Sequence, residues 1–124
     1  MNQKYSRNEH LKNYKQIQYL FENGVWVNKY PLKLIHCPNL DQATNFHKFG
    51  VSVSKRNYKR AVDRNYIKRL LRECFRLNKD QLYSAFSQPH LFMLLYVGKE
   101  IITYKDLEDT YKNLLNKCSF KEQV

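Results

Sequence analysis

Cysteine is scarce in this sequence, and its three copies form no recognisable framework. Cys37, Cys74 and Cys118 are an odd number and lie far apart along the chain. Disulfide-stabilised small domains and structural zinc sites need paired or closely spaced cysteines, so neither class is indicated. The simplest interpretation is three reduced thiols, as in a cytosolic protein.

Long apolar runs are also missing. The first ten residues, MNQKYSRNEH, contain no apolar segment that could act as a signal peptide, and the longest apolar run is LFMLLYV at residues 91–97. A helix needs about 20 apolar residues to cross a bilayer, so this run is far too short. We therefore expect a soluble, unexported, cytoplasmic protein with no membrane contact.

The sequence contains no pattern typical of a catalytic or metal site. His10, His36, His47 and His90 fall in different segments without HxxxH or HExxH spacing, so we interpret them as surface or strand-edge residues. There is no glycine-rich phosphate loop, and no serine or cysteine stands in a nucleophile motif. Cys74 is expected to be a buried thiol. We predict that the protein alone supplies neither a catalytic residue nor a metal ligand.

Acidic residues are few, and positive charge dominates. The chain has 22 Lys and Arg residues against 11 Asp and Glu, a net charge of +11 over 124 residues. Residues 55–76 contain nine Lys or Arg and two acids, a net +7, which leaves +4 for the rest of the chain. Such an excess repels itself in a compact fold, so it indicates a polyanionic partner. The length fits one domain, residues 1–124, with a single core.

The hydrophobic pattern predicts a helix and three strands in the first half of the chain. Apolar side chains recur at helical spacing over residues 13–23, and Gly24 follows as a stop. β-Branched and aromatic residues at 25–37, interrupted by Pro31, predict two strands. The alternation FGVSVS at 49–54 predicts a third strand, with valines on one face and serines on the other.

The second half of the sequence predicts two helices and a central strand. A basic helix runs to about Leu77, a polar connection covers 78–90, and segment 91–97 predicts a strand covered on both faces. Thr103 and Asp106 resemble a capping box that begins the last helix. The fold class is α/β in composition, an α+β two-layer sandwich with a mixed four-stranded sheet and about three helices in the order αβββαβα. The basic helix lies in the crossover between parallel strands.

The basic helix separates cations from apolar side chains. At about 100° per residue, the cations from Arg64 to Arg76 fall on one side, and Ile67 and Leu71 fall on the other. The part of the row from Arg64 to Arg76 spans roughly 18 Å. Like charges at i, i+4 weaken an isolated helix by a few tenths of a kcal/mol per pair. A row of phosphates is the expected compensation.

Two other interpretations of this helix compete with nucleic acid. A solvated surface helix is the commonest meaning of an outer charged face, but such faces interleave Glu with Lys and this one scarcely does. A helix on a membrane surface would expose Trp, Phe or Leu, whereas the apolar face here is expected to be buried by the fold. We therefore rank nucleic acid well ahead of both.

Residues 52–76, SVSKRNYKRAVDRNYIKRLLRECFR, resemble the signature of the bacterial ribonuclease P protein component. In that family a Ser-Val-Ser-Lys strand end and Ala-Val lead into Arg-Asn-Arg-x-Lys-Arg-x-x-Arg-Glu-x-Phe-Arg. The residues at matching positions are Ala61, Val62, Arg64, Asn65, Lys68, Arg69, Arg72, Glu73, Phe75 and Arg76. The likeness extends more weakly to the first helix, the apolar strand and the last helix, so it covers most of the chain.

Two positions depart from the family pattern. Tyr66 replaces the second arginine of the Arg-Asn-Arg trio, and we expect its ring to pack beside the apolar side of the helix with the hydroxyl outward. Ile17 replaces one of two aromatics that the family places one turn apart on the first helix, so only Phe21 matches. The charged row is intact in spite of both changes.

The resemblance implies a protein subunit of ribonuclease P, which removes the 5′ leader of precursor tRNA with an RNA subunit and its bound magnesium ions as the catalytic centre. One protein per RNA subunit would assist without holding magnesium alone. The implied RNA-binding residues are Lys55, Arg56, Arg60, Arg64, Asn65, Lys68, Arg69, Arg72 and Arg76. The implied leader cleft, between the first helix and the sheet, consists of Ile17, Phe21, Ser52, Ser54 and Lys55. A general RNA-binding protein of ribosomal or nucleoid type is the alternative.

Overall fold

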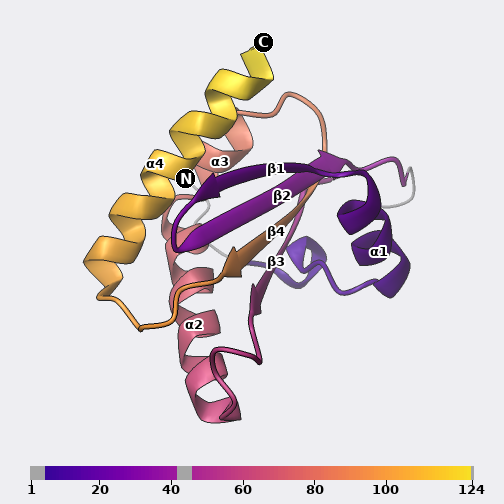
Figure 1. Cartoon of the computed structure of the whole chain (residues 1–124). Coiled ribbons are helices and arrows are strands. Elements are labelled where there is room, and N and C mark those ends of the chain that lie inside the picture. The colour runs from indigo at the N-terminus through magenta and orange to yellow at the C-terminus, as the bar shows by residue number, and fades with distance from the viewer. Residues whose placement is uncertain (1–4, 42–45, 124) are drawn as a thin grey trace.

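The computed structural model describes residues 5–41 and 46–123 of the chain (Figure 1). The elements in chain order are the 3-10 helix η1 (Arg7–Glu9), α1 (Tyr14–Asn23), β1 (Val25–Lys29), β2 (Leu32–Pro38), β3 (Lys48–Val53), α2 (Ala61–Leu77), α3 (Lys79–Ser84), β4 (His90–Tyr96) and α4 (Tyr104–Gln123). The predicted helix 13–23, the paired strands around Pro31 and the basic helix all form within a residue or two of the expected bounds.

The four strands form one mixed sheet in the order β1-β2-β4-β3. Strand β2 pairs antiparallel with both β1 and β4, whereas β3 pairs parallel with β4. The apolar strand β4 is therefore central, and almost all of its side chains are buried. The predicted parallel crossover that carries the basic helix is confirmed.

The segment predicted as a connection, residues 78–90, contains the additional helix α3. The described chain therefore has four α-helices, in the order αβββααβα, and the expected total of about three was one short. Helix α3 has only six residues, of which Lys79 and Leu82 are buried. Such a short segment contains too few apolar residues for a helical pattern to be recognised in the sequence.

Helices α2 and α4 cover one face of the sheet. Their core contains Phe49, Phe92 and Leu94 from the strands with Leu71 and Tyr111 from the helices. The lower part of Figure 1 shows α2 passing across the sheet near β3, with α4 alongside on the left. These helices and the sheet form the predicted two-layer sandwich.

Helix α1 covers only part of the opposite face. Asn13 begins the helix, since its side-chain oxygen accepts a hydrogen bond from Gln16 N at 3.2 Å. Buried Leu20 packs onto Ile35, in a small core that also contains Met93. Gly24 ends the helix at a point without room for a side chain, because a Cβ there would lie 2.4 Å from Ile35. This close approach fixes α1 over β2 and β4 and leaves the rest of the face uncovered.

Candidate nucleic-acid interface

The buried side of α2 is centred closer to the cations than the sequence indicated. Phe75 is fully buried and its ring stacks on Phe49 with the centroids 3.9 Å apart. Phe75 lies between Arg64 and Lys68 around the helix axis, at about 100° per residue. Both of these cations are consequently half-buried at the margin of the packed side, rather than opposite to it.

Arg64 is held by the backbone of the turn before α2. Its Nη1 donates hydrogen bonds to the carbonyl oxygens of Tyr58 and Lys59, at 2.8 and 2.7 Å. Arg60, the N-cap, contributes no side-chain cap of its own. The guanidinium of Arg64 therefore fixes the entry into the helix as well as adding a positive charge.

The remaining cations divide into paired and unpaired groups. Arg76 forms an ion pair with Glu73, whose pKa this hydrogen bond lowers, and Arg60 lies 3.9 Å from Asp63. Across the described residues, no salt bridge involves the cations at the centre of the helix, which are Lys68, Arg69 and Arg72. Lys55, Arg56, Asn65, Arg69 and Arg72 are exposed. The unpaired charge is thus concentrated in the middle of α2 and in the turn before it.

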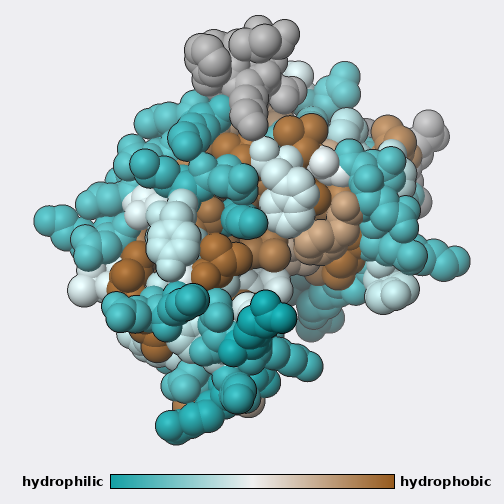
Figure 2. Space-filling model, viewed as in Figure 1, coloured by the Kyte–Doolittle hydropathy of each residue, from teal (hydrophilic) through white to brown (hydrophobic). Residues whose placement is uncertain are grey.

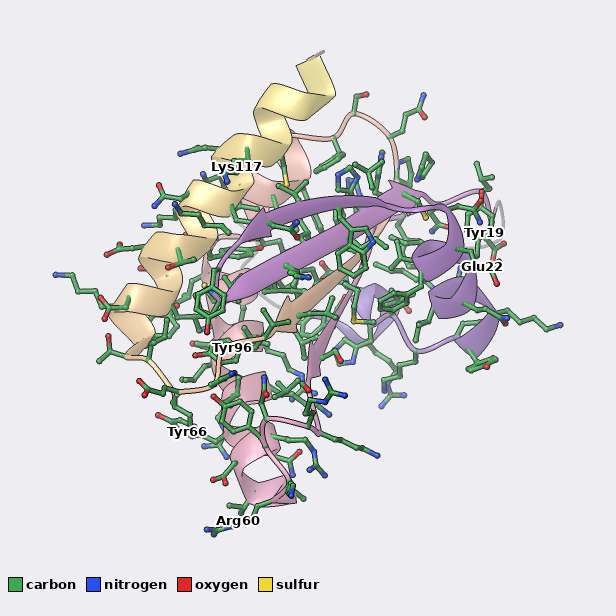
Figure 3. The ribbon with its side chains drawn as sticks, viewed as in Figure 1. Tyr19, Glu22, Arg60, Tyr66, Tyr96 and Lys117 are labelled. Atoms are coloured by element: carbon green, nitrogen blue, oxygen red, sulfur yellow. The ribbon has the colours of Figure 1, made fainter. Side chains whose placement is uncertain are left out.

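Tyr66 does not pack as expected. Its side chain is 45% exposed, and Figure 3 shows it projecting from α2, at the same end of the helix as Arg60. Val62 and Leu77, on the same side of the helix, are exposed as well. The prediction of a packed ring was wrong because the shift of the buried side toward Phe75 leaves this flank of α2 in solvent.

We predict that Tyr66→Arg will change affinity for RNA by less than about threefold. The position lies about 120° around the helix from Arg72 and about 160° from Lys68, so a cation there faces away from these two unpaired charges and borders only Arg69. An exposed substitution should also leave the free energy of unfolding within about 0.5 kcal/mol. Filter binding and thermal unfolding measure the two quantities. A tenfold gain in affinity would show instead that RNA reaches this flank.

The open face of the sheet carries one row of side chains across all four strands. Strand register aligns Asn28, Lys33, Leu95 and Ser52 in that order from β1 to β3. Leu95 packs partly against the core under α1, so this row lies on the face that α1 leaves uncovered. Figure 2 shows apolar surface in the middle of the molecule and hydrophilic side chains around it, densest at the lower end where α2 begins.

The structure brings together some of the predicted cleft residues and separates others. Ile17 packs partly into the core under α1, and Phe21, one turn later, is 41% exposed. Ser52 lies in the open row described above. Ser54 lies beyond it in the turn after β3, where its Oγ accepts a hydrogen bond from Arg56 N at 3.2 Å. Lys55 is exposed in the same turn, between the open face and α2.

Sequence reasoning missed two residues of this face, Trp26 and Lys33. Both stand in the segment 25–37, whose β-branched and aromatic residues were interpreted only as strand formers. Alternation along the strands was the available signal, because it places Trp26 opposite to buried Val27 and Lys33 opposite to buried Leu34.

A hollow at the edge of β3 connects α2 with the open face. It has a volume of about 380 Å³ and is lined by Tyr5, Leu11, Lys12, Gly50 and Arg72, among others. Burial raises the pKa of Tyr5 to about 12, although the nearby Arg72 lowers it. Two cations from distant parts of the sequence, Lys12 and Arg72, therefore line the same hollow.

Contacts of Glu9 with α3 hold the N-terminal segment beside this hollow. Lys79 Nζ lies 2.7 Å from one carboxylate oxygen of Glu9, and Tyr83 OH donates to the other at 2.7 Å. Burial raises the pKa of Glu9, but the hydrogen bonds from Lys79 and Tyr83 outweigh it and leave the pKa below its ordinary value. The missed helix α3 thus anchors the segment that carries Lys12.

His47, which directly precedes β3, contributes no positive charge to these surfaces at neutral pH. His36 and His90 are buried beside Phe86 on the inner strands β2 and β4, contrary to the expectation of surface or strand-edge positions. His47 Nδ1 accepts a hydrogen bond from His90 N at 3.0 Å. Burial, together with the neighbouring His90, lowers the pKa of His47 to about 4, so it is neutral at neutral pH.

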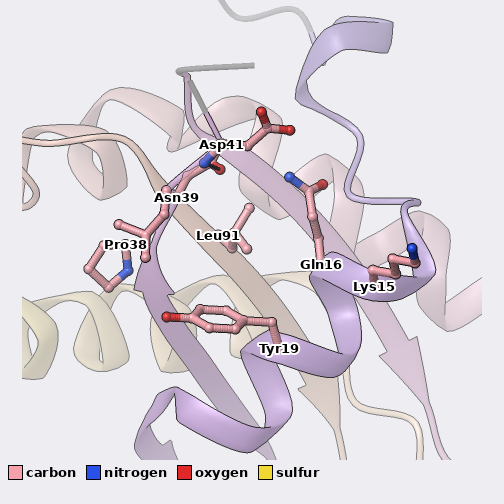
Figure 4. Close-up of a pocket in the computed structure, with 8 residues that line it drawn as sticks. Lys15, Gln16, Tyr19, Pro38, Asn39, Asp41 and Leu91 are labelled. Atoms are coloured by element: carbon pink, nitrogen blue, oxygen red, sulfur yellow. Dashed lines mark hydrogen bonds between the residues drawn. The ribbon is translucent and has the colours of Figure 1, made fainter. Parts of the chain in front are cut away.

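A smaller hollow lies where β2 ends and β4 begins (Figure 4). It has a volume of about 200 Å³, and the ring of Tyr19 lies across it from Pro38 and Leu91. None of the predicted site residues lines it. In the part of the chain that the structure describes, no group of three or more His, Cys, Asp or Glu side chains could hold a metal ion. No described helix is long and apolar enough to cross a membrane.

Comparison with known proteins identifies the family that combines this helix with this sheet. The family model for ribonuclease P matches residues 5–119. The chain belongs to the ribonuclease P protein family. A ribonuclease P protein component from Clostridium botulinum is 31% identical over 111 residues, which cover 87% of this chain and 92% of the relative. Another, from Porphyromonas gingivalis, is 29% identical over 106 residues, 83% of this chain and 77% of the relative.

Solved structures of ribonuclease P proteins have the same fold. The protein from Staphylococcus aureus, in a structure at 2.0 Å, matches with a TM-score of 0.72 at 22% identity, covering 88% of this chain and 94% of that one. The protein from Thermotoga maritima matches with a TM-score of 0.70 at 20% identity, covering 88% and 96%. The present ribonuclease P protein is therefore a subunit of the ribonucleoprotein enzyme that processes tRNA 5′ ends, and ribonuclease P RNA is its partner.

Proposed function

We propose that this subunit binds ribonuclease P RNA through α2 and the turn before it, and holds the 5′ leader of precursor tRNA on the open face of the sheet. The observation that carries the proposal is the position of the unpaired cations. Lys68, Arg69 and Arg72 form no salt bridge within the described residues, and Arg72 borders the hollow that leads to the open face. One continuous surface therefore offers positive charge on one side and half-exposed aromatic rings on the other.

The contact with ribonuclease P RNA is proposed to be made chiefly with phosphates. Arginine and lysine side chains at helical spacing fix the register of a nucleic-acid backbone without reading its sequence. The residues proposed for this contact are Lys55, Arg56, Arg60, Arg64, Asn65, Lys68, Arg69, Arg72 and Arg76. Among them Arg64 also holds the turn before α2, and Glu73 offsets the charge of Arg76.

The contact with the leader is proposed to be made by stacking and by a cationic groove. This combination holds single strands without sequence preference. Ile17 and Phe21 on α1 form one wall, and Ser52, Ser54 and Lys55 form the other. Ser54 contributes by shaping the turn that presents Lys55, since its Oγ is bonded to Arg56 N.

The chemistry of cleavage is proposed to belong to the RNA, with magnesium ions held chiefly by that RNA. The α2 surface is cationic, so it would bind the phosphates of the RNA and not compete for the ions. The protein positions the RNA subunit and the leader, as one copy per RNA subunit, in the cytoplasm where precursor tRNA is processed.

Reconstitution with a bacterial ribonuclease P RNA and precursor tRNA tests the proposal. We expect the protein to raise kcat/KM at subsaturating substrate, because it adds binding contacts to the RNA subunit and to the leader. The gain should be larger for a long leader than for a leader of a single nucleotide. An equal gain for both substrates would still support the proposed contact with the RNA subunit, but it would contradict the proposed contact with the leader.

A further inference from the structure

Trp26 lies at the edge of the open sheet face that is farthest from Ser52. Its register partner on β2, Ile35, packs under α1, so the indole is on the same face as that helix. The strand order places β1 and β3 at opposite edges of the sheet, about 14 Å apart at ordinary strand spacing. Trp26 therefore marks a part of the face that the predicted cleft residues on β3 do not reach.

A second aromatic ring and a cation flank the indole. The ring centroids of Phe21 and Trp26 are 5.9 Å apart with the planes inclined at 55°. Lys33 Nζ lies 5.9 Å from the centroid of the indole. Trp26 still keeps 38% of its surface exposed. The result is a pair of inclined aromatic rings with a flexible positive charge over one face of the indole.

The chemistry of this group matches a nucleotide of single-stranded RNA. Bases stack on aromatic side chains whatever their identity, and a neighbouring lysine suits the phosphate. Phe21 and Trp26 are adjacent and both exposed, and a group of exposed apolar rings, unlike a single one, indicates an interaction surface. Because residue 17 is isoleucine, α1 offers only one aromatic ring on the proposed leader wall, Phe21. A second ring at Trp26 would supply another stacking position.

We propose that Trp26 is a base-stacking site for the RNA leader, so that the leader surface extends from β3 across the sheet to β1. Lys33 lies between the two ends, in the open row with Leu95 and Ser52, and contacts the phosphate of the stacked nucleotide. This inference rests on the proposed function, because it requires the leader to lie on this face.

The indole itself provides the test, since Trp26 is the single tryptophan of the chain. Tryptophan emission is recorded from the holoenzyme, reconstituted with ribonuclease P RNA, as precursor tRNA is added. Substrates carry either a single-nucleotide leader or a leader long enough to cross the sheet. We expect the emission to be quenched by the long leader and unchanged by the short one.

Substitutions measure the same contact by affinity. Trp26→Leu keeps an apolar side chain beside Phe21 but lacks a flat ring, and should weaken binding of the long-leader substrate about 5- to 150-fold. Trp26→Phe should restore most of the loss. Val25→Ala is the matched control, because Val25 is an exposed neighbour whose register partner His36 packs with Phe86, on the opposite face. Thermal unfolding confirms that each variant is folded.

The outcomes separate the inference from the function on which it rests. If Phe21→Ala weakens binding of the long leader while Trp26→Leu does not, and emission stays constant, the leader uses this face without Trp26 and the inference is overturned. If neither substitution distinguishes long from short leaders, the leader lies elsewhere and the proposed function fails too. Quenching together with a loss confined to the long leader supports both.

Discussion

Replacing Lys68, Arg69 and Arg72 by glutamine should weaken binding to ribonuclease P RNA roughly 100-fold and flatten its salt dependence. These three cations have no acidic partner within the described residues, so their charge is available to phosphates. A net contribution of about 1 kcal/mol from each charged contact gives this loss. Each lost contact also removes about 0.7 to 0.9 from the slope of log K against log salt, and therefore about 2 to 3 in total.

A matched control removes the same charge from a different helix. Lys105, Lys112 and Lys117 are exposed on α4, so their replacement by glutamine lowers the net charge equally. That variant should retain most of its affinity and nearly all of its salt slope, because only long-range attraction is lost. Binding measured across a series of salt concentrations compares the two variants. Equal slopes for both would mean that net charge alone drives binding and that α2 is not the RNA surface.

The choice of these three residues depends on structure that the sequence pattern did not reveal. The pattern placed every cation from Arg64 to Arg76 on one outer side of the helix. Phe75 shifts the buried side, and with it Arg64 moves to the margin, where it binds the carbonyls of Tyr58 and Lys59. Helical projection assigns each residue an angle, but only the packing partner decides which angles are buried.

The sheet was predictable because the pattern of apolar residues within each strand indicates which of its faces are buried. Segment 91–97 is apolar at nearly every position, and it forms the central strand β4. Alternation along β3 placed Ser52 on the correct face. The row continues from Lys33 to Leu95, and this alignment depends on register between β2 and β4, which are distant in sequence, so no single strand specifies it. Consequently the half of the open face on β1 and β2 was missed.

The segment before α1 was the least predictable part of the site. Glu9 is fixed by Lys79 and Tyr83, which follow it by some seventy positions in the chain. A contact of this kind leaves no local periodicity. Its consequence for function is the placement of Lys12 in the hollow that Arg72 of α2 also lines.

Phe21→Ala should weaken binding of precursor tRNA about 5- to 150-fold, and only for leaders long enough to reach the open face. Loss of one stacked base costs about 1 to 3 kcal/mol, which gives this range. Phe21 is suited to the role because its ring is 41% exposed on α1 next to Trp26. The measurement is kcat/KM and the single-turnover rate at saturating substrate, in the reconstituted holoenzyme, with a single-nucleotide and a longer leader.

Comparison of subsaturating and saturating substrate separates binding of the leader from chemistry. A subunit that only holds the leader predicts that the Phe21→Ala defect disappears at saturation, since bound substrate is then cleaved by an intact RNA centre. Phe21→Leu is the control for packing, because it fills similar space under α1 without an aromatic face and should reproduce the binding defect without a loss of stability. A fall in the cleavage rate at saturation, equal for both leaders, would place Phe21 in the catalytic step or in the folding of the RNA, and the assignment of the leader to this face would have to be abandoned.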